Sequence, residues 1–132
     1  MSLNKFPSHL KYTKDHEWVE TSSKNPKIGV TTFAVEQLGD IVHLDLPKIG
    51  LQFKLGDSFG TIESTKTVSD LYMPLSGKVI NINEEALKKP EILQTDPYSL
   101  GWLIEIEPND EAELIKLMSD GDYEKYLRDS AE

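Results

Sequence analysis

The segment from Phe59 to Gly77 constrains the fold more than any other part of the chain. Residues 59–64 and 68–72 are rich in β-branched and aromatic residues, at the density that is typical of strands. Turn sequences that contain glycine or proline delimit both ends of the pair. The pattern predicts a β-hairpin with Lys66 at its tip. Because a lysine in a turn usually serves only solubility, the hairpin alone assigns Lys66 no function.

Further short strands are expected on both sides of this hairpin, separated by turn sequences. In residues 41–46, Val42, Leu44 and Leu46 alternate with polar residues, which is typical of a half-buried strand. The other expected strands are residues 12–13 and 16–20 as one first strand, then 27–30, 77–79 and 102–107. A strand that ends at a proline occurs in each half of the chain. The pattern predicts a mainly β protein, a flattened barrel-sandwich of two small sheets to which both halves contribute strands.

Short helices are expected between some of these strands. Thr31 or Thr32 is a suitable N-cap for a helix over residues 33–38, and Gly39 is a suitable end for it. Residues 84–89 have the composition of a second short helix. Neither segment is long enough to change the prediction of a mainly β fold.

The C-terminal segment is expected to be helical. Asn109 or Asp110 caps a first helix, and Ser119-x-x-Asp122 resembles a capping box for another. Leu114, Leu117 and Met118 fall on one face of the first helix, and the second contains Tyr123, Tyr126 and Leu127; we expect the segment to pack on the barrel edge. We therefore expect one domain, with an N-terminal extension over residues 1–10, a β core over 11–108 and a C-terminal helical segment over 109–132.

Composition excludes several classes of function. The chain has 132 residues and a net charge of −9, from 23 acidic and 14 basic residues, which argues against a nucleic-acid-binding protein, since such a protein needs a basic stripe. It has no cysteine, and therefore no disulfide, thiolate metal site or cysteine nucleophile. No apolar run is long enough to cross a membrane, and the N-terminus has neither a secretory nor an arginine-rich targeting pattern. We expect a cytoplasmic protein without a membrane partner.

Several motifs resemble one known family of carrier proteins. Glu63-Ser64-Thr65-Lys66 resembles the swinging-arm modules that carry lipoate or biotin on a hairpin lysine. Over nearly the whole chain, the order and spacing of the motifs resemble the H protein of the glycine cleavage system. These motifs include Asp15-His16-Glu17-Trp18-Val19, Gln37-Leu38-Gly39-Asp40, Asp96-Pro97-Tyr98 and Gly101-Trp102-Leu103. The chain departs from the usual family pattern at Thr67, His43 and Ser99-Leu100.

The resemblance implies a non-catalytic carrier with lipoate in amide linkage on Lys66. Such a carrier takes the aminomethyl group of glycine from the decarboxylase, the P protein, to the aminomethyltransferase, the T protein. The dihydrolipoyl dehydrogenase, or L protein, then reoxidises the dithiol. The resemblance also implies a lipoate ligase or octanoyltransferase that modifies Lys66, and a monomeric carrier.

A cleft with carboxylates is expected to shelter the loaded arm, because the aminomethyl adduct is a hydrolysable cation. With Thr65-Lys66 as the loop, strand alternation places Asp70 on the same face as Val68, with Glu63 opposite Val68. By resemblance, Glu17 lines the same cleft. In the alternative interpretation, Glu17 and Asp70 are ordinary solvated carboxylates. For the neighbouring Trp18 we favour a position in the core.

The tip sequence and the histidines bear on other classes of function. The tip sequence typical of a biotin carrier is Met-Lys-Met, and that of a lipoyl domain of a 2-oxoacid dehydrogenase is Asp-Lys-Ala. This chain has Thr65-Lys66-Thr67 instead. An H-like relay that donates lipoate to other enzymes needs the same lysine and remains an alternative, as does an unmodified interaction module. An enzyme is disfavoured, since His9, His16 and His43 are too scattered for a metal site and the neighbouring His16 and Glu17 alone are a weak acid–base signal.

Overall fold

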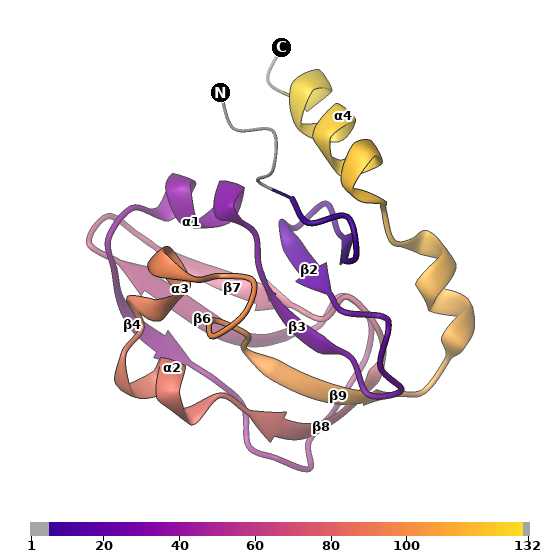
Figure 1. Ribbon diagram of the computed structural model, residues 1–132. Coiled ribbons are helices and arrows are strands. Elements are labelled where there is room, and N and C mark those ends of the chain that lie inside the picture. Colours follow the sequence, from indigo (N-terminus) through magenta and orange to yellow (C-terminus); the bar gives the residue numbers. More distant parts are fainter. Residues whose placement is uncertain (1–5, 131–132) are drawn as a thin grey trace.

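Two antiparallel sheets form the body of the protein in the computed structural model, which describes residues 6–130 (Figure 1). The larger sheet has the strand order β1 (Lys11–Tyr12), β2 (Glu17–Val19), β3 (Lys27–Val30), β9 (Ile104–Pro108), β8 (Gly77–Ile82) and β5 (Gln52–Phe53). The smaller sheet has the order β4 (Ile41–Asp45), β6 (Ser58–Ser64) and β7 (Val68–Tyr72). The predicted mainly β architecture of two sheets is confirmed, and both halves of the chain contribute strands to both sheets.

The main core lies between these sheets and is made mostly of aliphatic side chains. From the larger sheet Ile28, Val79 and Ile106 are fully buried, and from the smaller sheet Leu44 and Ile62 are buried against them. Burying a side chain of this size contributes about 1.5–3 kcal/mol. The hairpin of β6 and β7 is therefore anchored by its inward-facing residues, so its tip has a fixed position.

Five helical segments connect or follow the strands in the described part of the chain. They are α1 (Thr32–Leu38), α2 (Glu84–Lys88), α3 (Ile92–Thr95), the 3₁₀ helix η1 (Glu111–Lys116) and α4 (Asp120–Ser130). Thr31 caps α1 by accepting a hydrogen bond from the Ala34 amide at 3.3 Å, and Gly39 ends the helix with a φ of 84°. The first C-terminal helix is a 3₁₀ helix that ends at Lys116, whereas the predicted helix included Leu117 and Met118, which instead follow it in extended conformation.

The N-terminal strand prediction is wrong in one respect. Residues 11–19 form two antiparallel strands, β1 and β2, with Lys11 opposite Val19, instead of one continuous strand. A tight turn separates them, closed by hydrogen bonds from the His16 amide to the Thr13 carbonyl (3.1 Å) and from the Thr13 amide to the Glu17 carbonyl (3.0 Å). His16 adopts a φ of 67°, which reverses the chain where the pattern suggested continuity.

A β-bulge alters the expected alternation in β4. The register with β6 shifts between Ile41 and His43, so that Ile41 and Leu44 are buried while Val42 is 52% exposed. The predicted pattern, in which Val42 and Leu44 lie on one buried face, is therefore correct for Leu44 and wrong for Val42. The bulge brings Val42 to the surface of the strand that flanks the β6–β7 hairpin.

A second, aromatic cluster joins the N-terminal strands to α4. Leu10, Tyr12, Trp18 and Tyr123 are buried in it, and Trp18 donates a hydrogen bond from Nε1 to the Pro97 carbonyl at 3.0 Å. The predicted core position of Trp18 is confirmed. Figure 1 shows α4 on the side of β2, away from the interface between the two sheets.

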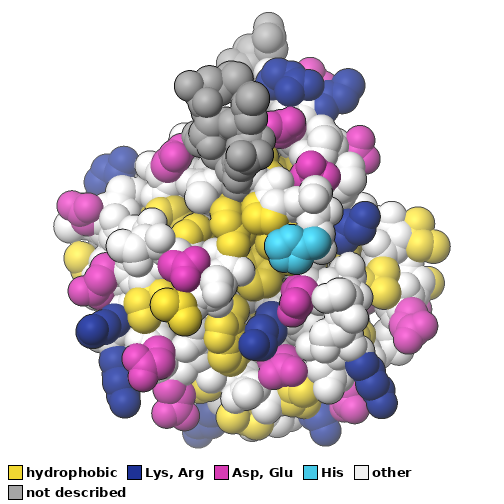
Figure 2. Space-filling model, in the orientation of Figure 1, with side chains coloured by type: hydrophobic (Ala, Val, Ile, Leu, Met, Phe, Trp, Pro, Cys, Tyr) yellow, Lys and Arg dark blue, Asp and Glu magenta, His cyan; other side chains and the backbone are white. Residues whose placement is uncertain are grey.

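The net charge of −9 is distributed widely over the surface. On the face shown in Figure 2, acidic side chains are interspersed with Lys and Arg and do not gather into one patch. Within residues 6–130, no helix is long and apolar enough to cross a membrane.

Candidate functional site

The tip of the β6–β7 hairpin is a two-residue turn, Thr65-Lys66, as predicted. Glu63 pairs with Val68, and the Ser64 amide donates to the Thr67 carbonyl at 2.8 Å. Turns of this length usually need residues with positive φ, but neither turn residue has one here. The buried Ser64 hydroxyl oxygen instead accepts hydrogen bonds from the amides of Lys66 (3.1 Å) and Thr67 (3.2 Å). One side chain thus fixes the turn that presents the lysine.

Lys66 is exposed, and its side chain begins beside the C-terminal end of α1. The Thr65 amide donates a hydrogen bond to the Asp40 carbonyl at 2.9 Å, which joins the tip to this end of the helix. The Lys66 side chain lies over Gly39, where a Cβ atom would be 3.2 Å from Lys66 Cε and 3.7 Å from Nζ. The absence of a side chain at Gly39 leaves space for the lysine stem.

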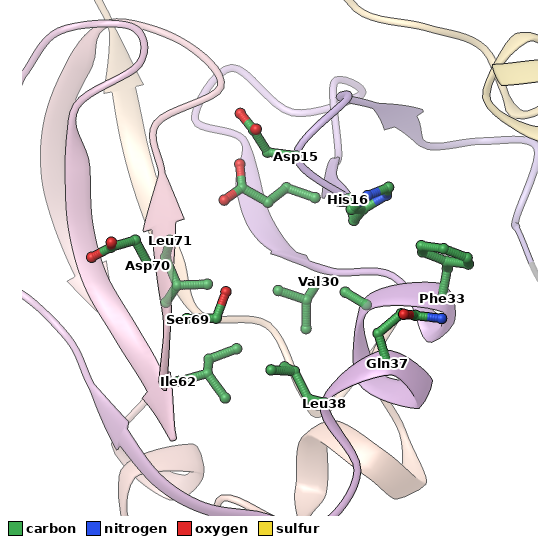
Figure 3. Close-up of a pocket in the computed structure, with 12 residues that line it drawn as sticks. Asp15, His16, Val30, Phe33, Gln37, Leu38, Ile62, Ser69, Asp70 and Leu71 are labelled. Carbon is green, nitrogen blue, oxygen red and sulfur yellow. The ribbon is translucent and has the colours of Figure 1, made fainter. Parts of the chain in front are cut away.

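A cavity of about 270 Å³ lies between α1 and β7 (Figure 3). Its walls are formed by Phe33, Ala34, Gln37 and Leu38 of α1, by Ile62, Ser69, Asp70 and Leu71 of the hairpin, and by Asp15, His16, Glu17 and Val30 of the larger sheet and the β1–β2 turn. Gln37 and Leu38 directly precede Gly39 in α1. The cavity wall therefore starts next to the Lys66 side chain and continues along the helix.

Glu17 is the most deeply buried ionisable group of the cavity, with 2% of its surface exposed. Its Oε2 accepts a hydrogen bond from the Tyr72 amide at 2.7 Å, while Oε1 is buried without a hydrogen-bond partner among the described residues. Burial raises the pKa of the Glu17 carboxyl well above its ordinary value, the Tyr72 amide opposes this, and the nearby charge of Asp15 adds to it. A cationic group that reached Oε1 would complete the hydrogen bonding of this carboxyl.

Asp15 is a second carboxylate of the cavity that the sequence reasoning did not select. It lies on the exposed β1–β2 turn, and its charge acts on both Glu17 and His16. Asp15 lies only two residues before Glu17, in the turn that leads into β2. This spacing was the available signal for Asp15.

Asp70 and Glu63 lie differently from what was expected. Asp70 borders the cavity, but its carboxylate points away from the cavity centre (Figure 3) and accepts a hydrogen bond from the Ser58 hydroxyl at 3.2 Å. Glu63 is exposed and is not among the cavity residues. The predicted pairing of Glu63 with Val68 is correct. The cavity lies beyond the edge of β7, and the Ser69 side chain points towards it. Glu63, Val68 and Asp70 therefore share the outer face of the smaller sheet.

Groups that could hold a metal ion are absent from residues 6–130: no cluster of three or more His, Asp or Glu side chains occurs there. Because the Asp70 carboxylate points away from the cavity centre, the chemistry available there is that of the Asp15 and Glu17 carboxyls, the His16 imidazole and an apolar wall. An apolar arm with a cationic end fits this set, since its body would face Val30, Leu38 and Ile62 and its end would face Glu17.

Comparisons with known proteins agree on one family. A family model described as "Glycine cleavage H-protein" matches residues 10–130. The "Glycine cleavage system H protein" of Carboxydothermus hydrogenoformans is 48% identical over 126 residues, which cover 96% of this chain and 97% of the relative. That of Oceanobacillus iheyensis is 48% identical over 123 residues, covering 93% and 98%. A crystal structure of a glycine cleavage system H protein from Mycobacterium marinum has a TM-score of 0.84 and 37% identity, and the match covers 92% of this chain and 98% of that one.

Proposed function

The chain belongs to the glycine cleavage H-protein family, and from this premise we propose that Lys66 carries lipoate and that the adjacent cavity holds the loaded arm. The family's role as the carrier of the glycine cleavage system is the function of this chain. Because the relatives are named for glycine cleavage, a relay that only donates lipoate to other enzymes is not favoured.

One observation supports the proposal above others. An exposed lysine at a rigid tip lies beside a cavity that contains a buried carboxyl oxygen without a partner among the described residues. The exposed amine can meet a modifying enzyme, and the rigid tip gives the arm one starting point. The unpartnered oxygen is the kind of group that a cationic cargo would bind.

When lipoate is bound, its sulfur supplies the attachment point for the aminomethyl group, while the protein supplies position and shelter. The apolar residues Val30, Leu38 and Ile62 face the body of the arm and exclude water from it. Glu17 passes its proton to an incoming neutral amine, or releases it to water when the incoming group is already an ammonium, so that a carboxylate faces an ammonium group. Such a charge-assisted hydrogen bond contributes about 1.5–3 kcal/mol where water is partly excluded.

Asp15 and Asp70 have smaller parts in this proposal. Asp15 is exposed at the cavity edge, so its attraction for the cargo is that of a surface pair, about 0–1 kcal/mol. Asp70 and Glu63 place negative charge on the outer face beside Lys66, where a partner enzyme would approach. We assign them to docking and Glu17 to retention.

The partners in this proposal are the P, T and L proteins, together with a lipoate ligase or octanoyltransferase that modifies a monomeric carrier. In this account the carrier itself performs no chemical step. Each partner acts on the arm after it leaves the cavity, and the protein contributes a single lysine and a shelter.

Mass spectrometry of protein made with a lipoylating enzyme and lipoate tests the proposal. We expect one lipoyl mass increment per chain, and peptide mapping is expected to locate it on Lys66. Lys66→Arg retains the charge but removes the acylable amine, so this variant should fold normally and remain unmodified. A lipoyl group on Lys54 or Lys78, or biotin in its place, would overturn the assignment.

A further inference from the structure

A chain of three polar side chains connects α4 to two walls of the cavity. The Tyr123 hydroxyl lies 2.8 Å from Nδ1 of His16 and 2.9 Å from the hydroxyl oxygen of Thr31. His16 belongs to the β1–β2 turn and lines the cavity. Thr31 caps α1, the helix that forms the opposite wall and ends beside Lys66. One hydroxyl group of the C-terminal helix thus bridges both elements.

Each member of this chain is constrained by its surroundings. Tyr123 and Thr31 are fully buried, and Tyr123 stacks on Tyr12 with ring centroids 5.0 Å apart and an interplanar angle of 8°. His16 is the only non-glycine residue with a positive φ among the described residues, and its ring lies 4.7 Å from that of Phe33, another cavity residue. A side chain on such a backbone needs a partner to keep its position. Tyr123 is the partner that the structure provides.

The hydrogen-bond capacity of Tyr123 couples His16 to Thr31. A phenol has one proton to donate, so it can donate to Nδ1 of His16 or to the Thr31 oxygen, but not to both. With the proton directed to Nδ1, His16 carries its own hydrogen on Nε2 and the Thr31 hydroxyl donates to Tyr123. Burial lowers the pKa of His16, against the opposing charge of Asp15, so the neutral ring is favoured. This arrangement also gives the Thr31 hydroxyl hydrogen its acceptor, so the Tyr123 hydroxyl favours one tautomer of neutral His16.

We propose that Tyr123 is a positioning residue of the arm cavity: through His16 and Thr31 it fixes two cavity walls, so that α4 controls how long the loaded arm is retained. This inference rests on the proposed function, since it presumes that the arm occupies the cavity. It assigns α4 a role beyond covering the barrel edge. Through the buried Tyr123 hydroxyl, the packing of α4 on the rest of the protein affects how firmly the cavity holds the cargo.

The chain offers a matched pair of variants for the test. Tyr123→Phe removes the bridging hydroxyl, and Tyr12→Phe removes the hydroxyl of the stacked partner ring, which donates to the Pro7 carbonyl at 2.6 Å and does not contact the cavity. Tyr123→Phe loses two hydrogen bonds and Tyr12→Phe loses one, so Tyr123→Phe is expected to lose more stability, and denaturant unfolding of both variants measures this difference. Only Tyr123→Phe changes the surroundings of His16.

Two measurements distinguish the variants. In unmodified protein, the nitrogen chemical shifts of His16 report its tautomer; we expect one tautomer in wild type and Tyr12→Phe, and a mixture in Tyr123→Phe. In lipoylated protein loaded with the aminomethyl group, we expect about two- to fivefold faster spontaneous loss in Tyr123→Phe, the factor that corresponds to about one ordinary hydrogen bond. Tyr12→Phe is expected to lose cargo at the wild-type rate.

Identical His16 shifts and identical cargo loss in all three proteins would overturn the inference. So would equal acceleration in both variants, because that result would show a general loss of stability. Glu17→Gln separates this failure from failure of the proposed function. If Glu17→Gln accelerates loss while Tyr123→Phe does not, the cavity holds the arm without help from α4; if neither accelerates it, the cavity does not hold the arm.

Discussion

The Lys66 side chain lies directly over Gly39, the residue that ends α1, so that a Cβ atom on Gly39 would come within 3.2 Å of Lys66 Cε. Gly39 also has a φ of 84°, which favours glycine for a separate reason. Glycine at this position therefore both ends the helix and leaves space for the Lys66 side chain. Leu38, the residue before Gly39, lines the cavity, so the cavity wall begins next to the Lys66 side chain.

Replacing Gly39 by alanine is expected to slow lipoylation several-fold and to lower the free energy of unfolding by about 1 kcal/mol. The added methyl group displaces the lysine stem, and the positive φ adds strain. Gly56→Ala is the matched control, because Gly56 has a φ of 91° and no atom beyond its chain neighbours lies within 4 Å of its Cβ position. The lipoylation rate by intact mass should fall in Gly39→Ala alone; an equal fall in both variants would attribute the effect to strain.

Ser64→Ala is expected to loosen the hairpin tip without unfolding the protein. The Ser64 hydroxyl oxygen accepts from two turn amides, and removing it costs about 1–2 kcal/mol in a turn whose φ angles are otherwise unsuited to a two-residue connection. Amide hydrogen exchange at Lys66 and Thr67 should accelerate. Ser58→Ala, on the same strand but away from the turn, should leave these amides unchanged. Unchanged exchange in Ser64→Ala would show that other contacts hold the tip.

Stability is expected to depend on pH through Glu17. Its pKa is higher in the folded than in the unfolded protein, so the native state binds more protons and stability falls as pH rises from the ordinary glutamate pKa to the raised value. Glu17→Gln retains an acceptor for the Tyr72 amide but cannot ionise. Denaturant unfolding at a series of pH values should show this variant more stable than wild type near neutrality, by an amount on the order of 1 kcal/mol. The difference should vanish in acid; a variant less stable at every pH would contradict the raised pKa.

The β architecture and the hairpin were predictable because their signals are local. Strand composition on both sides of Lys66, with a two-residue turn, fixes the register that pairs Glu63 with Val68. The core position of Trp18 follows from the same kind of pattern. Local signals did not reveal the reversal at His16, since its positive φ is stabilised by contacts with residues far along the chain, including Thr31 and Tyr123.

The cavity was only partly predictable. Alternation placed Asp70 and Glu63 on one face of the hairpin, but which face meets the cavity depends on where α1 and β2 pack, and this is a tertiary property. Glu17 was found through the resemblance, whereas its burial and unpartnered oxygen required the structure. The connection through Tyr123 joins residues more than ninety positions apart in sequence, and no local pattern indicates it.

The central claim is that a buried carboxyl at Glu17 retains the loaded arm of Lys66. The most direct measurement is the rate at which lipoylated protein, loaded with the aminomethyl group, loses it spontaneously in wild type, Glu17→Gln and Asp70→Asn. With one charge-assisted hydrogen bond lost, Glu17→Gln should lose the group about tenfold faster or more, while Asp70→Asn, whose carboxylate points away from the cavity centre, should remain near the wild-type rate. Equal rates in wild type and Glu17→Gln would contradict the account.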